Sequence, residues 1–204
     1  CWCSMSLFEA NHRANLIPQD GDLNDYGCIL DLQAASVWFA TLLEVTPWQH
    51  DEVLVFGKRI TTARKVAWYG DAPYYYSGAL KQPLPWSEAM LALKAMVETR
   101  TGHSFNSCLV NLYENGSQGV GWHSDDETTL GKAPTIASLS LGASRRFCFK
   151  HKINGKKCEL PLASGQLILM HGDLQRYWLH AIPKMAGVTA PRINLTFRTI
   201  HPSV

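Results

Sequence analysis

The sequence predicts one mostly β domain with flanking helices (α+β), a barrel or sandwich that carries its helices on one side. The chain has 204 residues, the length of one domain, and its 46% hydrophobic and 18% charged residues are typical of a globular core. Helical spacing of apolar residues is confined to the first half, whereas short alternating segments fill the second half. The helix–strand alternation of a doubly wound sheet is absent.

Two helices are predicted in the first half of the chain. Residues 1–30 are polar and rich in turn formers, so we expect an irregular lead-in there. Over residues 32–46 apolar side chains recur at helical spacing, and Asp31 is available as the N-cap. A second helix is expected over residues 86–100, before Gly102 stops it.

Strands are predicted from about residue 105 onward, at spacings of about ten residues. Asn154-Gly155 is typical of a hairpin turn between two of them. The expected strands cover residues 107–113, 135–141, 146–151, 157–162, 166–170, 177–182 and 192–200.

The cysteines and the short apolar runs favour a reducing, non-membrane environment. Six scattered cysteines without a Cys-x-x-Cys pair favour free thiols in a reducing environment over a disulfide framework or a cysteine zinc site. The longest apolar runs, such as residues 167–170, are far shorter than the roughly 20 residues of a membrane span. With no secretion signal at the start, we expect a monomer in the cytoplasm, or in the nucleus of a eukaryote, without membrane contact.

The charge is unevenly distributed along the chain. Residues 1–52 hold eight acidic residues against one arginine, whereas the remainder is basic. The basic residues indicate either a polyanionic partner or loops that are simply solvated, and charge alone favours neither. They form two clusters, the first of Lys58, Arg59, Arg64 and Lys65, and the second of Arg145, Arg146, Lys150, Lys152, Lys156 and Lys157.

Two histidines and one carboxylate are candidate metal ligands. His123-Ser124-Asp125 is an H-x-D pair, and His180 follows in a strand-like segment. Two imidazoles and a carboxylate on one face of Fe(II) leave positions open for an oxo-acid and O₂. An isolated H-x-D is also consistent with a histidine that caps a turn.

The last predicted strand alternates between polar and apolar residues, so its polar side chains share one face. If the apolar face formed the core, the polar face would meet solvent. Alternatively, its two guanidinium groups suit a dicarboxylate, because each can bind one carboxylate through two hydrogen bonds. The polar row is Arg192, Asn194, Thr196 and Arg198, and Asn111 and Tyr113 share a face of an earlier strand.

Together these motifs resemble the AlkB family of Fe(II)- and 2-oxoglutarate-dependent dealkylating dioxygenases, closest to the homologues that repair duplex DNA. The resemblance covers residues from about Val53 to Ile200. It implies a double-stranded β-helix (jelly-roll) core at about 105–200 and nucleotide-recognition hairpins at about 51–82, within a dioxygenase domain of residues 51–204. Residues 1–50 would be an acidic lead-in and helix. The motifs are Asn111-x-Tyr113, His123-x-Asp125, His180 and residues 191–198.

The resemblance also implies roles for these residues. The catalytic iron would be bound by His123, Asp125 and His180, while His171 lacks the aromatic-x-His context and is assigned no ligand role. In binding 2-oxoglutarate, Arg192 would pair with the distal carboxylate, assisted by Asn194 and Tyr113. Arg198, with Asn111, would hold the carboxylate nearer the metal. Thr196 belongs to the same polar row.

Substrate contacts are implied in the same way. Residues 69–78 look like the nucleotide-recognition hairpin, although three consecutive tyrosines would otherwise be interpreted as core. Tyr76 and His123 would stack on the flipped base, with Tyr74 as a polar contact and Glu127, beside Asp126, near its exocyclic amino group. A base methylated on a ring nitrogen can be cationic, so aromatic faces and a carboxylate favour it.

Phe56 ends an apolar run and is followed by Gly57 and Lys58. The resemblance implies that its ring wedges into the gap left by the flipped base, as apolar wedges do elsewhere, whereas a Phe at such a position is otherwise usually core. The basic residues of 145–157 would then follow phosphates.

The predicted function is oxidative demethylation, a direct reversal of damage, of bases such as 1-methyladenine and 3-methylcytosine in single- or double-stranded DNA. Fe(II), 2-oxoglutarate and O₂ would hydroxylate the N-methyl group, which leaves as formaldehyde. The alternatives are an RNA demethylase of the same family and a non-catalytic jelly-roll module that binds nucleic acid.

Overall fold

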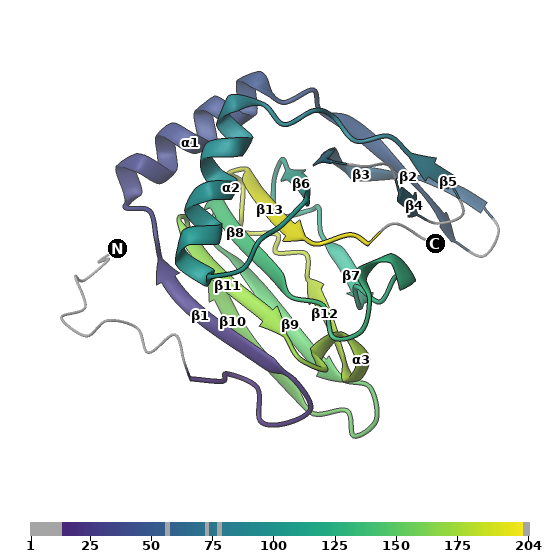
Figure 1. Cartoon of the computed structure of the whole chain (residues 1–204). Coiled ribbons are helices and arrows are strands. Elements are labelled where there is room, and N and C mark those ends of the chain that lie inside the picture. Colours follow the sequence, from purple (N-terminus) through teal and green to yellow (C-terminus); the bar gives the residue numbers. More distant parts are fainter. Residues whose placement is uncertain (1–13, 56–57, 72–73, 77–78, 202–204) are drawn as a thin grey trace.

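Two antiparallel sheets face each other, and two helices cover the outer face of the larger one (Figure 1). The structure is a computed structural model of the chain that describes residues 14–55, 58–71, 74–76 and 79–201. This arrangement confirms the predicted sandwich with its helices on one side, and its element order is that of a jelly-roll core.

The larger sheet contains seven strands and the smaller sheet four. In spatial order the larger sheet is β1 (Asp22–Cys28), β11 (Gln166–His171), β8 (Ile136–Gly142), β13 (Arg192–Arg198), β6 (Ser107–Tyr113), β3 (Lys58–Gly70) and β2 (Gln49–Val55). The smaller sheet is β10 (Lys157–Leu162), β9 (Arg145–His151), β12 (Trp178–Ile182) and β7 (Val120–His123).

The two long helices begin and end where their capping residues predict. In α1 (Leu32–Val45) the Asp31 side chain accepts a hydrogen bond from the Ala34 amide at 2.7 Å. In α2 (Glu88–Thr101) Ser87 caps the start, and Gly102 ends the helix in the left-handed conformation with φ of 73°. Two shorter elements are the 3₁₀ turn η1 (Thr128–Leu130) and α3 (Leu174–Tyr177).

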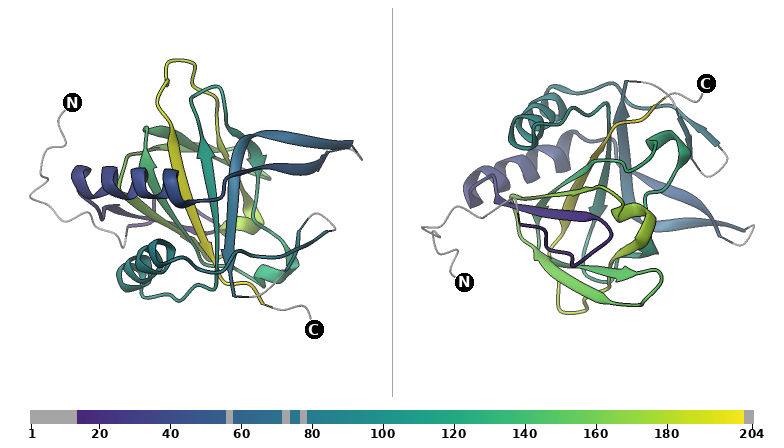
Figure 2. Two further views of the ribbon diagram at one scale, coloured as in Figure 1. Left: turned by 90° about the horizontal axis from the view of Figure 1, so that it is seen from above. Right: turned by 60° about the horizontal axis from the view of Figure 1, so that its bottom comes forward.

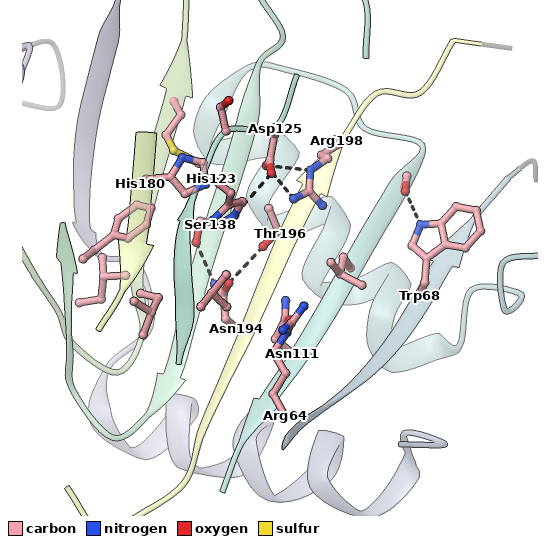
Figure 3. A pocket seen from close by; sticks show the side chains of 18 of the residues that line it. Arg64, Trp68, Asn111, His123, Asp125, Ser138, His180, Asn194, Thr196 and Arg198 are labelled. Carbon is pink, nitrogen blue, oxygen red and sulfur yellow. Dashed lines mark hydrogen bonds and ion pairs between the residues drawn. The ribbon is translucent and has the colours of Figure 1, made fainter. Parts of the chain in front are cut away.

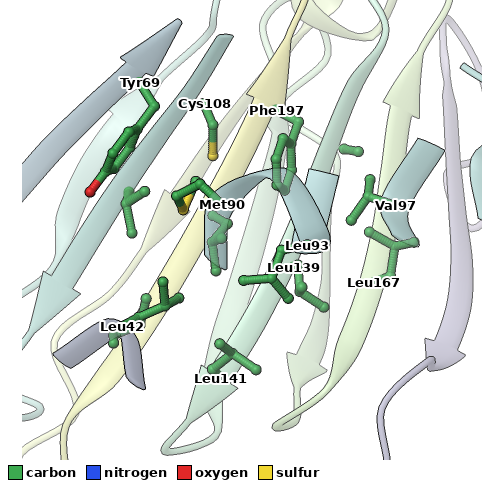
Figure 4. Packing of buried hydrophobic residues seen from close by; sticks show 14 of the residues in the cluster. Leu42, Tyr69, Met90, Leu93, Val97, Cys108, Leu139, Leu141, Leu167 and Phe197 are labelled. Carbon is green, nitrogen blue, oxygen red and sulfur yellow. The ribbon is translucent and has the colours of Figure 1, made fainter. Parts of the chain in front are cut away.

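The main core lies between these helices and the larger sheet (Figure 4). Leu42 of α1 and Leu93 of α2 are both fully buried there, against the apolar residues of β8 and β13. Since side chains alternate along a strand, the apolar face of β13 points to the helices and its polar face points between the two sheets. The polar row of β13 therefore faces the interior rather than solvent, with Arg192 only 1% exposed.

The expectation of an irregular lead-in over residues 1–30 is wrong for Asp22–Cys28, which form β1 and pair with β11. The turn-forming residues of this segment have a physical explanation. β1 is an edge strand, so one side of it faces solvent, and its register shifts between Asp25 and Cys28, where Gly27 has a φ of 68°. Tyr177, expected in a strand, instead ends α3.

Two hairpins project from one side of the sandwich, formed by β2 with β3 and by β4 (Tyr74–Tyr76) with β5 (Ala79–Lys81) (Figure 2). Tyr74 and Tyr76 lie on β4, paired with Lys81 and Ala79, and the contacts of their side chains lie outside what the structure describes. Phe56 also lies outside the described residues.

Two further predictions concern the cysteine thiols and the absence of membrane-spanning segments. Within the described ranges, Cys28, Cys108, Cys148 and Cys158 are all free thiols, as predicted for them. None of the helices in the described part of the chain has the length and apolar character needed to cross a membrane.

Candidate functional site

The three predicted metal ligands meet between the sheets (Figure 3). His123 ends β7 and pairs directly with His180 of β12, and their ring centroids are 4.3 Å apart. Asp125 follows two residues after β7, and its Oδ1 lies 3.8 Å from His123 Nε2. One ligand atom from each residue lies within 4.8 Å of the others, and no other such group of three occurs among the described residues.

The protonation states of His180 and Asp125 suit a divalent metal. Burial, followed by the charges of His123 and Arg198, lowers the pKa of His180 to about 3, although Asp125 opposes the shift. Burial alone would raise the pKa of Asp125, but Arg198 and the two histidines outweigh it and bring the pKa to about 2. At neutral pH the site therefore offers a neutral imidazole and an ionised carboxylate, which are the forms that bind metals.

Hydrogen bonds orient the ligands. His123 Nδ1 lies 2.9 Å from the Gly121 carbonyl, and since a carbonyl only accepts, Nδ1 carries a proton and Nε2 is the nitrogen left for a metal. Asp125 Oδ2 accepts from Arg198 Nη2 at 2.7 Å and Nε at 3.1 Å. His180 Nδ1 is buried without a hydrogen-bond partner among the residues described. A buried nitrogen without a partner fits a metal ligand.

A cavity of about 410 Å³ extends from this triad along the inner face of the larger sheet. Arg192 pairs with Tyr113 and Asn194 with Asn111 across β13 and β6, so these side chains share the face that lines the cavity. The structure thus brings together every residue predicted to bind 2-oxoglutarate. They are Asn111, Tyr113, Arg192, Asn194, Thr196 and Arg198.

Arg192 is a buried cation with hydrogen-bonding capacity left for an anion. Its Nη2 donates to Ser140 Oγ at 2.9 Å, but within the described part of the chain Nε and Nη1 have no hydrogen-bond partner. The guanidinium lies 5.4 Å from the centre of the Tyr113 ring, and burial lowers its pKa to about 10, so it is still charged at neutral pH. A buried charge without a partner is costly, which makes a carboxylate of a bound ligand the fitting counterion.

Asn194 and Thr196 form a fixed polar network beside it. Thr196 Oγ1 donates to Asn194 Oδ1 at 3.1 Å, and Asn194 Nδ2 donates to Ser138 Oγ at 2.8 Å. Asn111, by contrast, accepts from Arg64 Nε at 2.9 Å. These bonds fix the side-chain amides and so define the shape of the cavity wall.

The sequence did not single out Arg64 and Trp68 of β3 as cavity residues, yet both line it. Trp68 Nε1 donates to Ser107 Oγ at 2.7 Å. The available signal was their spacing, since residues four apart on a strand share a face, but only the pairing of β3 with β6 shows which face meets the cavity.

The two acids after Asp125 differ in position. Glu127 lines the cavity, and its pKa is raised by burial and then by the neighbouring Asp125. Asp126 has an exposed side chain and accepts from Ser124 Oγ at 3.0 Å. His171 lies on β11, where its Nε2 contacts the Asn24 side chain, away from the triad.

Two residues of the second basic cluster make hydrogen bonds within the protein, and one of them, Arg145, is buried. Arg145 is 1% exposed, and its Nη2 donates to the carbonyls of Gln118 at 2.7 Å and Pro183 at 2.8 Å. Lys152 bonds to Ser124 and to the Gln175 carbonyl. The interpretation of residues 145–157 as phosphate contacts is therefore wrong for Arg145, which is buried on backbone carbonyls. For Lys152, which is exposed, it stays a prediction.

Comparisons with known proteins agree with this site. The chain matches the family described as 2OG-Fe(II) oxygenase superfamily (2OG-FeII_Oxy_2) over residues 27–198. It is 43% identical over 183 residues to the Bos taurus protein "Alpha-ketoglutarate-dependent dioxygenase alkB homolog 3", covering 85% of this chain and 64% of that protein. It is 41% identical over 162 residues to "DNA oxidative demethylase ALKBH2" of Mus musculus, covering 74% and 68%.

A solved structure described as "The structure of OsALKBH1" shares the fold, with a TM-score of 0.61 at 18% identity, covering 90% of this chain and 99% of that one. This chain spans just under two thirds of the length of the bovine relative, 64%. The family match begins at residue 27, so the expected start of the resemblance near Val53 is wrong. Residues 27–52 pack in the sheet and in α1 and contain none of the metal-binding or arginine motifs from which the resemblance was identified.

Proposed function

This chain belongs to the 2OG-Fe(II) oxygenase superfamily, in its AlkB family, and from that premise we propose that it demethylates N-alkylated bases of DNA by oxidation. One observation carries the proposal. A candidate metal triad of two histidines and one aspartate lies in the same cavity as Arg192, a buried cation with two nitrogens that have no hydrogen-bond partner among the described residues. When bound, Fe(II), 2-oxoglutarate and O₂ supply hydroxylation of the N-methyl group, with succinate, CO₂ and formaldehyde as products.

The chain's own residues position the reactants. His123, Asp125 and His180 hold the iron, and Arg198 keeps Asp125 ionised and oriented through its two hydrogen bonds. Arg192 binds the distal carboxylate of 2-oxoglutarate. Because both guanidinium groups are already held by neighbouring side chains, little ordering is needed when the cofactor binds.

The base pocket is proposed to lie on the side of Glu127 and Trp68, which both line the cavity. A carboxylate there favours a base that carries a positive charge after methylation of a ring nitrogen, as in 1-methyladenine and 3-methylcytosine. Tyr76 and His123 are proposed to stack on the flipped base, with Tyr74 as a polar contact.

Duplex DNA is the proposed form of the substrate. Arg146, Lys156 and Lys157 have exposed side chains on the β9–β10 hairpin and are available to phosphates. Phe56 is proposed to fill the gap left by the flipped base.

The decisive experiment adds Fe(II) and 2-oxoglutarate without oxygen and looks for the metal-to-ligand charge-transfer band. O₂ and oligonucleotides containing 1-methyladenine or 3-methylcytosine are then added, and the repaired base and formaldehyde are measured. We expect the band and stoichiometric formaldehyde with DNA. Faster turnover of the same lesion in RNA would replace DNA by RNA as the substrate, and a band without repair of either would overturn the proposal.

A further inference from the structure

We propose that Lys152 is a positioning residue for the iron site. It holds the turn of His123-Ser124-Asp125, which carries two of the three candidate iron ligands, instead of contacting nucleic-acid phosphates. The inference rests on the proposed function only in assuming that the triad binds iron. Lys152 follows directly after β9 in a hairpin rich in basic residues, yet its ammonium group is directed at the protein.

The contacts of Lys152 converge on the turn between the first two ligands. Its Nζ donates to Ser124 Oγ at 2.9 Å, and Ser124 is the middle residue of the H-x-D pair. Ser124 Oγ in turn donates to Asp126 Oδ2 at 3.0 Å, and Lys152 Nζ lies 3.8 Å from the same carboxylate oxygen. Lys152 thus contacts the residues on both sides of Asp125.

Lys152 also holds the other support of Asp125. Its Nζ donates to the Gln175 carbonyl at 2.9 Å, and the Gln175 side chain accepts from the Asp125 amide at 2.9 Å. Gln175 is 2% exposed and belongs to α3, which leads directly into β12 and the third ligand, His180. One ammonium group therefore links the turn that carries two ligands to the helix that precedes the third.

The charge balance supports the same role. Three consecutive acids at 125–127 repel one another, and Arg198 bonds to the first of them while Lys152 lies beside the second. The Lys152 side chain is 28% exposed and the Asp126 side chain 68%, so solvent screens this pairing, and the positioning depends on the hydrogen bonds of Lys152 to Ser124 and Gln175. Groups that orient metal ligands in this way change metal affinity by about 10–100-fold when they are removed.

The test compares Lys152→Gln with Lys156→Gln, which removes the same charge from an exposed position on the same hairpin. Fe(II) affinity is measured without oxygen by titrating the charge-transfer band at saturating 2-oxoglutarate. DNA affinity is measured on the metal-free protein with a single-stranded oligonucleotide containing 1-methyladenine. We expect about tenfold weaker Fe(II) binding for Lys152→Gln and unchanged Fe(II) binding for Lys156→Gln, while Lys152→Gln leaves DNA binding unchanged.

Further variants separate positioning from general stability. Lys152→Arg keeps a donor and should restore most of the Fe(II) affinity, and Ser124→Ala should weaken it in the same direction as Lys152→Gln. Because both changes remove one contact, their effects should be non-additive in the double variant. Wild-type Fe(II) affinity in Lys152→Gln with weakened DNA binding would overturn the inference, whereas failure of the wild-type protein to bind Fe(II) would instead overturn the proposed function.

Discussion

Substitution of Arg192 by Met tests the assignment of the 2-oxoglutarate end of the cavity. Arg192 is fully buried, with Nη2 bonded to Ser140 and with Nε and Nη1 unbonded within the described part of the chain. These two nitrogens are the ones available to a carboxylate. In the variant, the distal carboxylate of 2-oxoglutarate would be buried without a counterion.

The size of the effect follows from that burial. Removing one partner of a buried ion pair costs about 3–5 kcal/mol, and about 1.4 kcal/mol corresponds to a tenfold change in affinity. We therefore expect 2-oxoglutarate to bind roughly a hundred- to several-thousand-fold more weakly. The melting temperature of the ligand-free variant should not fall, because Arg192 without a ligand is a costly buried charge that Met replaces with an apolar side chain.

The assay is a titration of the anaerobic charge-transfer band with 2-oxoglutarate, and 2-oxopentanoate is the matched control ligand. This control has a methyl group in place of the distal carboxylate, so Arg192→Met should hardly change its affinity. Equal losses for both ligands would indicate a distorted cavity. Unchanged 2-oxoglutarate affinity would refute the assignment of Arg192.

The remaining predictions concern the triad, the wedge and acid stability. Ala at His123, Asp125 or His180 should abolish turnover and the charge-transfer band, whereas His171→Ala should retain both, and the opposite result for His171 and His180 would exchange their roles. Phe56→Ala should lower repair of a methylated duplex far more than repair of the same lesion in a single strand, with stability within about 1 kcal/mol; an equal loss on both substrates would instead indicate a core position. The metal-free protein should lose stability on acidification, because the pKa of His180 is about 3 when folded against 6.5 when unfolded, so the unfolded chain takes up the proton first. From pH 7.5 to 5 this amounts to about 2 kcal/mol, and urea titrations should show a flatter pH dependence for His180→Gln.

Local patterns in the sequence were sufficient for most elements of the fold. The two helices could be predicted because the caps Asp31 and Ser87 and the stop at Gly102 act within a few residues of the helix. The strand Ser107–Tyr113 was predicted with its observed bounds. The metal triad could be found because the H-x-D pair and the later histidine are recognisable as residue types in order.

Tertiary structure decided what each face of an element meets. The period of two in β13 separates polar from apolar residues, but it does not say which side is covered by α1 and α2 and which side faces the second sheet. The edge strand β1 was missed for a related reason. Its pairing depends on β11, about 140 residues later, and not on its own polar composition.

The basic residues show most clearly that the sequence does not reveal what each side chain contacts. In the sequence Arg145, Lys152 and Lys156 are equivalent charges of one cluster, yet Arg145 is buried on backbone carbonyls, Lys152 holds the iron-ligand turn and Lys156 is exposed. The sequence by itself determined most of the secondary structure, the candidate metal ligands and the candidate carboxylate-binding row, because these depend on neighbouring residues and their spacing. Only the tertiary structure decided the role of each charge, because that depends on the distant groups that desolvate it and bond to it.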